Sequence, residues 1–224
     1  MQIIKAIGRK ELGKVLYEQN LKDTLLVDSY NGATLNMDQF VCFNPFHTWP
    51  KPQIPVPGSP ALLSISIEGI WQGTKYINGE TDLQQLHTIP YKRPPEEQDK
   101  TFAYDATQFI YGQSVIEHVE ARFLIYLLSY LYLLDVIVSG EVILYIKRLI
   151  MNGKSVLFCD LDENFDITNV SESFSHSTIL ASWFSNTLVQ DFLPLAKAAL
   201  TDEYYCIFIA EFKKLLTRYK KIHR

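Results

Sequence analysis

Apolar residues recur at intervals of three and four along several stretches of the chain, and this spacing predicts helices. Short apolar runs that end in turn residues predict strands. Helices are expected over 6–20, 64–79, 114–138, 140–153, 173–193 and from Asp202 to the end, and strands over 24–30, 40–46 and 154–162. The last of these strands has an uninterrupted apolar centre over 156–159, which is typical of a strand buried on both faces.

Two segments between these elements carry turn-forming residues. Residues 49–60 contain repeated prolines, which fix φ and remove amide donors, so they predict an extended and rigid loop. Residues 91–100 are polar and contain two adjacent prolines, which predicts a flexible or inserted loop.

The apolar stretch 123–138 is the candidate for a membrane span. It is shorter than the roughly 20 apolar residues that a spanning helix needs, and it contains Asp135. We therefore interpret it as the central buried helix of a soluble domain, without membrane association. The N-terminal residues show no apolar leader, and Cys42, Cys159 and Cys206 form no metal-binding or disulfide pattern. Free thiols and a cytoplasmic location follow as expectations.

Composition supports an ordinary globular protein. The chain has 224 residues, of which 47% are hydrophobic and 21% charged, enough to build one large core. The predicted fold class is α+β: an α-rich single domain over 1–224, with a helical core, a few short strands and a flexible loop near 91–100. A net charge of −4 argues against a surface built mainly for nucleic acid. The basic end, 213–224, either contacts phosphates or simply favours the helix dipole.

The stretch SISIEGIWQGTKYING, residues 64–79, places polar residues on one face of its predicted helix. Glu68, Gln72 and Lys75 follow the i, i+4, i+7 rule, and Trp71 flanks them. Gly69 and Gly73 form another face that is open to close backbone approach, and Ser64 or Ser66 is expected to cap the helix. The alternative is a surface helix whose charged residues are solvated.

The letters of this helix resemble the NADAR superfamily, the YbiA-like proteins. The pattern SxExxxQxxK is present as Ser66, Glu68, Gln72 and Lys75, with Trp71 at the aromatic position. Upstream, the segment CFNPF supplies Asn44 and Phe46. The resemblance covers about 40–76. The same stretch also resembles an uncharacterised bacterial and phage family, which is interpreted as a distant relative of that superfamily. It implies a NADAR-like fold and hydrolysis of a ribosyl C–N bond, in an ADP-ribosylated base or a phosphoribosyl nucleotide, without metal or cofactor.

The resemblance also implies roles for individual residues. Glu68 would stabilise the charge that develops on the ribose, and Lys75 would hold a phosphate or protonate the leaving base. The residues expected to bind substrate are Asn44, Phe46, Trp71, Gln72 and Arg122. A second acid, Asp160 or Asp162, follows the buried strand 154–162, where the alternative is a solvated turn. The expected partner is a nucleotide or an ADP-ribose-type molecule, including an ADP-ribosylated nucleic acid.

Other patterns carry weaker hypotheses. Arg122 either clamps a phosphate or pairs with Glu117, Glu120 or Asp135. The alternating acids from Asp160 to Asp166 lack the glycine and the final glutamate of a calcium-binding loop. Ser175, His176 and Ser177 suggest a hydrolase, but helix capping by Ser173 or Ser175 explains them better in the absence of a nucleophile elbow. Two alternative functions stay open: a catalytically silent nucleotide-binding module in phage–host conflict, and a structural protein–protein interaction domain.

Overall fold

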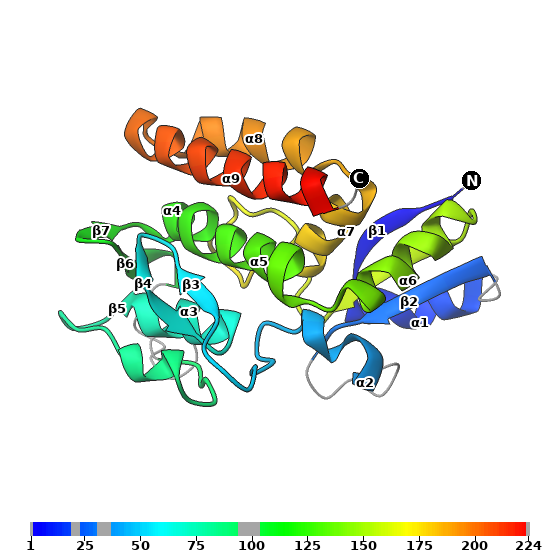
Figure 1. The fold of residues 1–224 in the computed structure, drawn as a ribbon, viewed down its shortest axis with the longest axis horizontal. Helices are drawn as coiled ribbons and strands as arrows, with labels where there is room; N and C mark the ends of the chain where they lie inside the picture. Colours follow the sequence, from blue (N-terminus) through cyan, green and yellow to red (C-terminus); the bar gives the residue numbers. More distant parts are fainter. Residues whose placement is uncertain (1, 19–22, 31–36, 94–103, 223–224) are drawn as a thin grey trace. The chain divides into compact units, whose positions relative to one another are not determined.

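The computed structural model describes residues 2–18, 23–30, 37–93 and 104–222 (Figure 1). The chain divides into two compact units, each built from three separate segments. Unit 1 comprises Met1–Asn44, Val138–Asp166 and Ser173–Phe192, and unit 2 comprises Pro45–Ile137, Ile167–Glu172 and Leu193–Arg224. A single folding domain over 1–224 stays a prediction. Most of the expected flexible loop near 91–100 lies outside the described residues.

Unit 1 contains a parallel three-stranded sheet. Its strands are β1 (Ile4–Gly8), β8 (Ser155–Asp160) and β2 (Thr24–Asp28), in the order β1-β8-β2. The predicted strands over 24–30 and 154–162 are confirmed, and β8 is buried on both faces as expected. The last strand in sequence therefore lies in the middle of the sheet.

Helices cover both faces of this sheet because successive strand residues point to opposite sides. The helix α1 (Arg9–Glu18) packs Leu12 and Val15 onto one face, against a cluster that includes Cys159. On the other face Phe158 of β8 stacks on Phe184 of α7 (Ser177–Ser185), with ring centroids 5.1 Å apart. The helix α6 (Gly140–Met151) also contacts β8, and Gly153 follows it at φ 80°. In Figure 1 α1 and α6 lie beside the strands.

Three sequence predictions in unit 1 are wrong. Residues 4–8 form strand β1, although the expected helix begins at residue 6. The segment 40–46 is not a strand: α2 (Met37–Phe40) and a 3₁₀ turn (Val41–Phe43) occupy it, because helical spacing stacks Phe40 on Phe43 at 6.3 Å. The helix over 173–193 is two helices, α7 and α8 (Leu188–Ala199), since Asn186 adopts a left-handed conformation between them.

Unit 2 contains two small antiparallel sheets. The proline-rich segment forms a hairpin of β3 (Ile54–Val56) and β4 (Ser59–Ser64), with an irregularity between Pro55 and Val56 where proline cannot donate. The second sheet joins β5 (Lys75–Tyr76), β6 (Gln108–Tyr111) and β7 (Ser114–Ile116). Short 3₁₀ turns cover Leu83–Leu86 and Tyr104–Ala106. The extended character of the proline-rich segment is confirmed, but as a hairpin.

A buried helical rod crosses unit 2. It consists of α4 (His118–Ala121), a π-helical stretch (Arg122–Leu127), α5 (Leu128–Tyr132) and a second π-helical stretch (Leu133–Ile137). The C-terminal helix α9 (Asp202–Ile222) packs on it through Phe208, 5.6 Å from the ring of Phe123. Within the described ranges no single helix is both long and apolar enough to cross a membrane; one pair of consecutive helices passes only when counted together.

The predicted fold class, a NADAR-like α-rich domain with a helical core, is wrong. The described residues form three small sheets, and the parallel one is the centre of unit 1. Apolar spacing predicts helix for residues that form β1 and β7. The partner of β1, strand β8, lies far along the chain and is not visible in a local pattern, whereas β7 forms an unpredicted hairpin with the adjacent strand β6.

Candidate functional site

The helix α3 (Ile67–Thr74) carries most of the predicted site residues, and local capping explains where it starts. Ser66 is its N-cap, and its Oγ accepts the N–H of Gly69 at 2.9 Å. The N–H of Glu68 donates to the carbonyl of Pro45 at 2.9 Å. The predicted serine cap is confirmed, and the two bonds satisfy amides that the first helical turn leaves without partners.

The end of α3 comes earlier than the sequence predicts. Lys75 leaves the helical conformation with ψ 131° and starts β5. Asn78 and Gly79 have φ of 54° and 82°, and Ile77 pairs with Glu80 across them. Asn-Gly therefore forms a tight hairpin turn, which requires positive φ at both positions, and does not stop a helix.

The two glycines of α3 lie against another backbone segment. A Cβ on Gly69 would lie 2.5 Å from the carbonyl oxygen of Gln85, and one on Gly73 would lie 3.2 Å from that of Asp82. These carbonyls belong to the 3₁₀ turn Leu83–Leu86 and the residue before it. The predicted close backbone approach is confirmed, with the chain's own turn as the neighbour.

Glu68, Gln72 and Lys75 are turned into unit 2. Their exposed fractions are 6%, 1% and 0%. The Nε2 of Gln72 donates to Oε1 of Glu68 at 2.6 Å, which fixes the carboxylate. The alternative of a solvated surface helix is wrong. Burying a carboxylate and an ammonium costs several kcal/mol for each ion unless the surroundings compensate, so this cluster has a structural or chemical reason to exist.

Arg93 completes the cluster and was missed from the sequence. Its backbone N–H donates to Oε1 of Gln72 at 2.9 Å. Its Nη1 donates to the carbonyls of Gln72 and Lys75, at 3.1 and 2.9 Å. A guanidinium at the C-terminal end of a helix donates to carbonyls that have no partner within the helix, and its positive charge interacts favourably with the helix dipole. The only signal for it in the sequence is a basic residue inside the proline-containing polar segment.

Trp71 lies in an aromatic cluster. Its ring centroid is 4.2 Å from that of Phe109 and 5.5 Å from those of His118 and Tyr126. The side chain is 7% exposed. These contacts give Trp71 a packing role, so the cluster forms a rigid wall behind the polar face of α3.

Arg122 donates hydrogen bonds to the backbone carbonyls of one segment. Its Nη1 donates to the carbonyls of Ile167 at 3.2 Å and Asn169 at 2.5 Å, and its Nη2 donates to that of Glu172. The planar fork thus anchors the segment Ile167–Glu172 through three carbonyls. These hydrogen bonds account for the burial of the guanidinium without any bound ligand.

The remaining predicted residues are distributed between the units. Phe46 lies in unit 2, half-buried, one residue after the carbonyl that binds Glu68 N–H. Asn44 belongs to unit 1 and is buried. Asp160 also belongs to unit 1, where its Oδ2 contacts Nδ1 of His176 and accepts from Ser175 Oγ, both at 2.9 Å.

Asp160 is a buried carboxylate rather than part of a solvated turn. Burial by itself raises its pKa, but the charge and hydrogen bond of His176, the Ser175 hydroxyl and the Leu161 N–H outweigh burial, so its pKa lies below the ordinary value of 3.8. The predicted capping of α7 by Ser173 or Ser175 is wrong: the N-cap is His176, without a side-chain cap bond.

The cysteines are free thiols, as predicted. Burial raises the pKa of Cys42 to about 11 and that of Cys159 to about 12, so neither ionises near neutral pH. Across the described residues, no cluster of three His, Cys, Asp or Glu side chains is arranged to hold a metal ion. Function without metal or cofactor stays a prediction.

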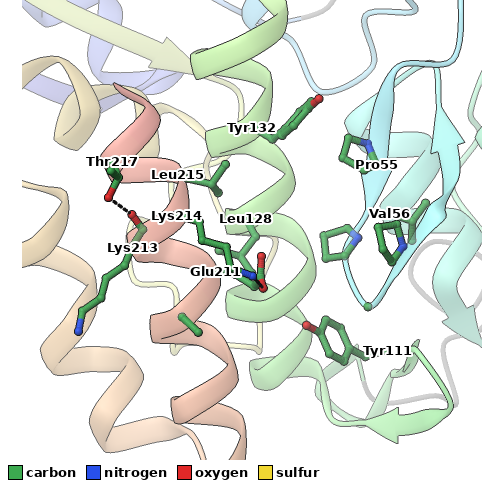
Figure 2. Close-up of a pocket in the computed structure, with 14 residues that line it drawn as sticks. Pro55, Val56, Tyr111, Leu128, Tyr132, Glu211, Lys213, Lys214, Leu215 and Thr217 are labelled. Atoms are coloured by element: carbon green, nitrogen blue, oxygen red, sulfur yellow. Dashed lines mark hydrogen bonds and ion pairs between the residues drawn. The ribbon is translucent and has the colours of Figure 1, made fainter. Parts of the chain in front are cut away.

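Unit 2 also has an open cavity of about 810 Å³, which is lined by other residues (Figure 2). The proline-rich hairpin forms one wall, and Leu128, Tyr132 and α9 form the other. Tyr111 lines it, and burial together with the charge of Glu211 raises the pKa of this tyrosine. Its volume is typical of small-molecule sites, but none of the predicted site residues lines it.

The fold and these sites define a mixed α and β protein of two compact units, one with a buried polar cluster on α3. The chain belongs to a family of unknown function, DUF6939, whose model matches residues 16–180. No curated protein and no solved structure matches the chain.

The NADAR assignment is therefore wrong, since the family that matches most of the chain is a different one. A few letters on one short helix carried the resemblance. Those letters reflect local needs that α3 shows directly: a serine cap, glycines at a close backbone contact, and a glutamine that holds a buried glutamate.

Proposed function

We propose that the protein is a hydrolase that cleaves the C–N bond between a ribose and a base in a phosphorylated nucleotide, including an ADP-ribosylated base. The observation that carries the proposal is the buried cluster of Glu68, Gln72 and Lys75 on one side of α3 and its end. A cytoplasmic location, where nucleotides are abundant, is part of the proposal.

The carboxylate suits the charge that develops in this reaction. Breaking a ribosyl C–N bond builds positive charge on C1′ and on the ring oxygen, and a fixed anion in a water-poor site stabilises it. Glu68 is 6% exposed and is held by Gln72 at 2.6 Å, so it needs little reorganisation. Glu68 also accepts a proton from the attacking water.

Lys75 supplies the opposite charge. Glu68 lies in the first turn of α3 and Lys75 directly follows the last helical residue, so the two charged side chains come from opposite ends of this short helix. The ammonium of Lys75 is fully buried. It either protonates the leaving nitrogen or binds a phosphate.

Gln72 and Arg93 act as positioning residues in this scheme. The amide of Gln72 donates to Glu68 and accepts from Arg93 N–H, so it links the carboxylate to the end of the helix. Gln72 is therefore a positioning residue in this proposal, in place of the substrate-binding role that the resemblance implies.

The test is turnover of ADP-ribosylated guanosine, ADP-ribosylated DNA and NAD, with the released base followed by chromatography. Replacing Glu68 by Gln is expected to lower turnover by roughly 10²–10⁴-fold while the circular dichroism spectrum stays unchanged. Glu80→Gln, at an exposed turn position, is the matched control and should retain full turnover. Binding of these ligands by calorimetry without turnover would favour the silent binding module, and absence of both would refute the proposal.

A further inference from the structure

Three polar side chains from distant parts of the sequence lie in a row in unit 1. The Oγ of Ser29 is 2.6 Å from Nε2 of His176, and Nδ1 of the same ring is 2.9 Å from Oδ2 of Asp160. Their exposed fractions are 1%, 4% and 3%. The two ring nitrogens of one histidine thus face a hydroxyl on one side and a carboxylate on the other.

The parallel sheet creates this alignment. Ser29 follows β2 directly, and Asp160 is the last residue of β8. The two strands are neighbours, with Asp28 opposite Cys159, so both carboxyl ends meet at one edge of the sheet. In open α/β sheets this edge is where ligand sites lie. His176 begins α7, which packs on β1 and β8.

Asp160 is held so that it orients the imidazole. The Ser175 hydroxyl donates to its Oδ2 at 2.9 Å, and the Leu161 N–H donates to its Oδ1 at 2.7 Å. Its pKa stays below the ordinary value despite burial, so it faces His176 as an anion. A carboxylate on Nδ1 favours a proton there, and in that tautomer Nε2 accepts from the Ser29 hydroxyl, whose Oγ also lies 3.2 Å from the Cys159 carbonyl oxygen.

A second buried acid lies at the same edge. Asp28 is 1% exposed, and Arg9 Nη1 contacts its Oδ2 at 3.1 Å. Burial is the main reason that its pKa is raised, and the charge of Asp160 adds to the effect. Buried ionisable groups that perturb one another are common at functional sites.

We propose that Ser29 and His176 are the catalytic residues of a second site, with Asp160 as their positioning residue, and that this site hydrolyses esters of small acyl groups such as acetyl. The proposal does not depend on the function assigned to α3. It uses nucleophilic catalysis, which the geometry of hydroxyl, imidazole and carboxylate supports.

The reaction balances with ester and water alone. Ser29 Oγ attacks the carbonyl carbon, and its proton passes to Nε2 of His176. The C–O bond to the alcohol breaks, and the alcohol leaves with that proton. Water then attacks the acyl-serine, gives a proton to Nε2, and releases the acid as Ser29 regains its hydrogen.

Burial limits the substrate. Ser29 is only 1% exposed, so a small acyl group reaches its hydroxyl more readily than a long chain. We therefore expect p-nitrophenyl acetate to be hydrolysed faster than p-nitrophenyl octanoate.

The decisive measurement uses the full-length wild type. Phenylmethylsulfonyl fluoride should add one sulfonyl group, and peptide mass spectrometry should locate it on Ser29. Wild-type protein that stays unlabelled at Ser29 would overturn the proposal and would leave a purely structural network.

Variants separate the roles. Ser29→Ala is expected to abolish labelling and ester hydrolysis, and His176→Gln to slow both by roughly 10²–10⁴-fold. Asp160→Asn should lower kcat by a similar factor with KM little changed, and should shift the pH–rate profile. Ser185→Ala is the control, because its hydroxyl donates to the Ala181 carbonyl at 2.7 Å and lies outside the row. Equal ester hydrolysis by folded wild type, Ser29→Ala and His176→Gln would also refute the site.

Discussion

At the scale of single residues, buried polar groups form hydrogen-bonded networks in both units. Gln72 bonds both Glu68 and Arg93, and Asp160 takes bonds from three partners. A buried polar atom that lost such a partner would cost about 1–3 kcal/mol. These networks therefore constrain the side chains tightly.

The pH dependence of stability provides a test for Asp160. Because its folded pKa is lower than the ordinary value of 3.8, its stabilising contribution is complete above that value and is lost as pH falls through the folded pKa. Asp160→Asn should remove this acid-induced loss. Urea unfolding from pH 6 down to pH 2 measures it, and a variant with the same acid slope as wild type would contradict the prediction.

Asp28 is the control, because its pKa is shifted in the direction opposite to that of Asp160. Its folded pKa is raised, chiefly by burial, so the folded state loses stability as pH rises from the ordinary value of 3.8 through the folded pKa. Asp28→Asn should therefore flatten a slope that Asp160→Asn leaves in place. Identical pH profiles for the two variants would contradict the assigned causes.

The sequence pointed to α3 and, separately, to Asp160 and His176, but not to the row that these two form with Ser29. The helical spacing of Glu68 and Gln72 is local, and so it predicted that they share a face. Ser29 and His176 are separated by a hundred and more residues and meet only through the pairing of β2 with β8 and the packing of α7. The available signal was that Ser29 and Asp160 each stand at the end of a buried apolar run.

At the scale of elements, local patterns succeeded where neighbours in sequence are neighbours in space. Ser66 caps α3, and Gly69 lies close to another backbone segment, as expected. Local patterns failed for β1, whose partner β8 lies far along the chain. They also failed for the segment 40–46, whose apolar run packs as a short helix. Propensity cannot separate a short buried strand from a helical turn.

The contact at Gly69 gives a test at this scale. Gly69→Ala would place a Cβ 2.5 Å from the Gln85 carbonyl oxygen, so we expect a loss of about 1–3 kcal/mol in the free energy of unfolding. Gly13→Ala in α1 is the matched control, because no atom lies within 4 Å of its added Cβ. That change should be neutral or stabilising by up to about 1 kcal/mol, since alanine favours helix. Denaturant unfolding of both variants measures the difference, and equal effects would contradict the close approach.

At the scale of the whole molecule, each unit draws on three separate segments. In unit 1 β1 and β2 both pair with β8 and not with each other. Removing β8 thus removes the partner of both strands at once. The sheet depends on one strand more than on any other part of the unit.

A truncation tests this dependence. A chain that ends at Ile137 keeps β1 and β2 but lacks β8, so their amides should exchange with solvent without protection. Hydrogen-exchange mass spectrometry over residues 4–28, compared with the full-length protein, measures this. Native-like protection in the truncated chain would show that the two strands form structure independently.

The late position of β8 also has a consequence during synthesis. The ribosome completes β2 at Asp28 and reaches β8 only at Ser155. At about 5–20 residues per second, the intervening stretch of about 130 residues takes roughly 6–25 s to translate. Throughout that delay the apolar edges of β1 and β2 are exposed in the nascent chain. Cells that make this protein should therefore need holding chaperones, and slower translation between the two strands should increase its aggregation.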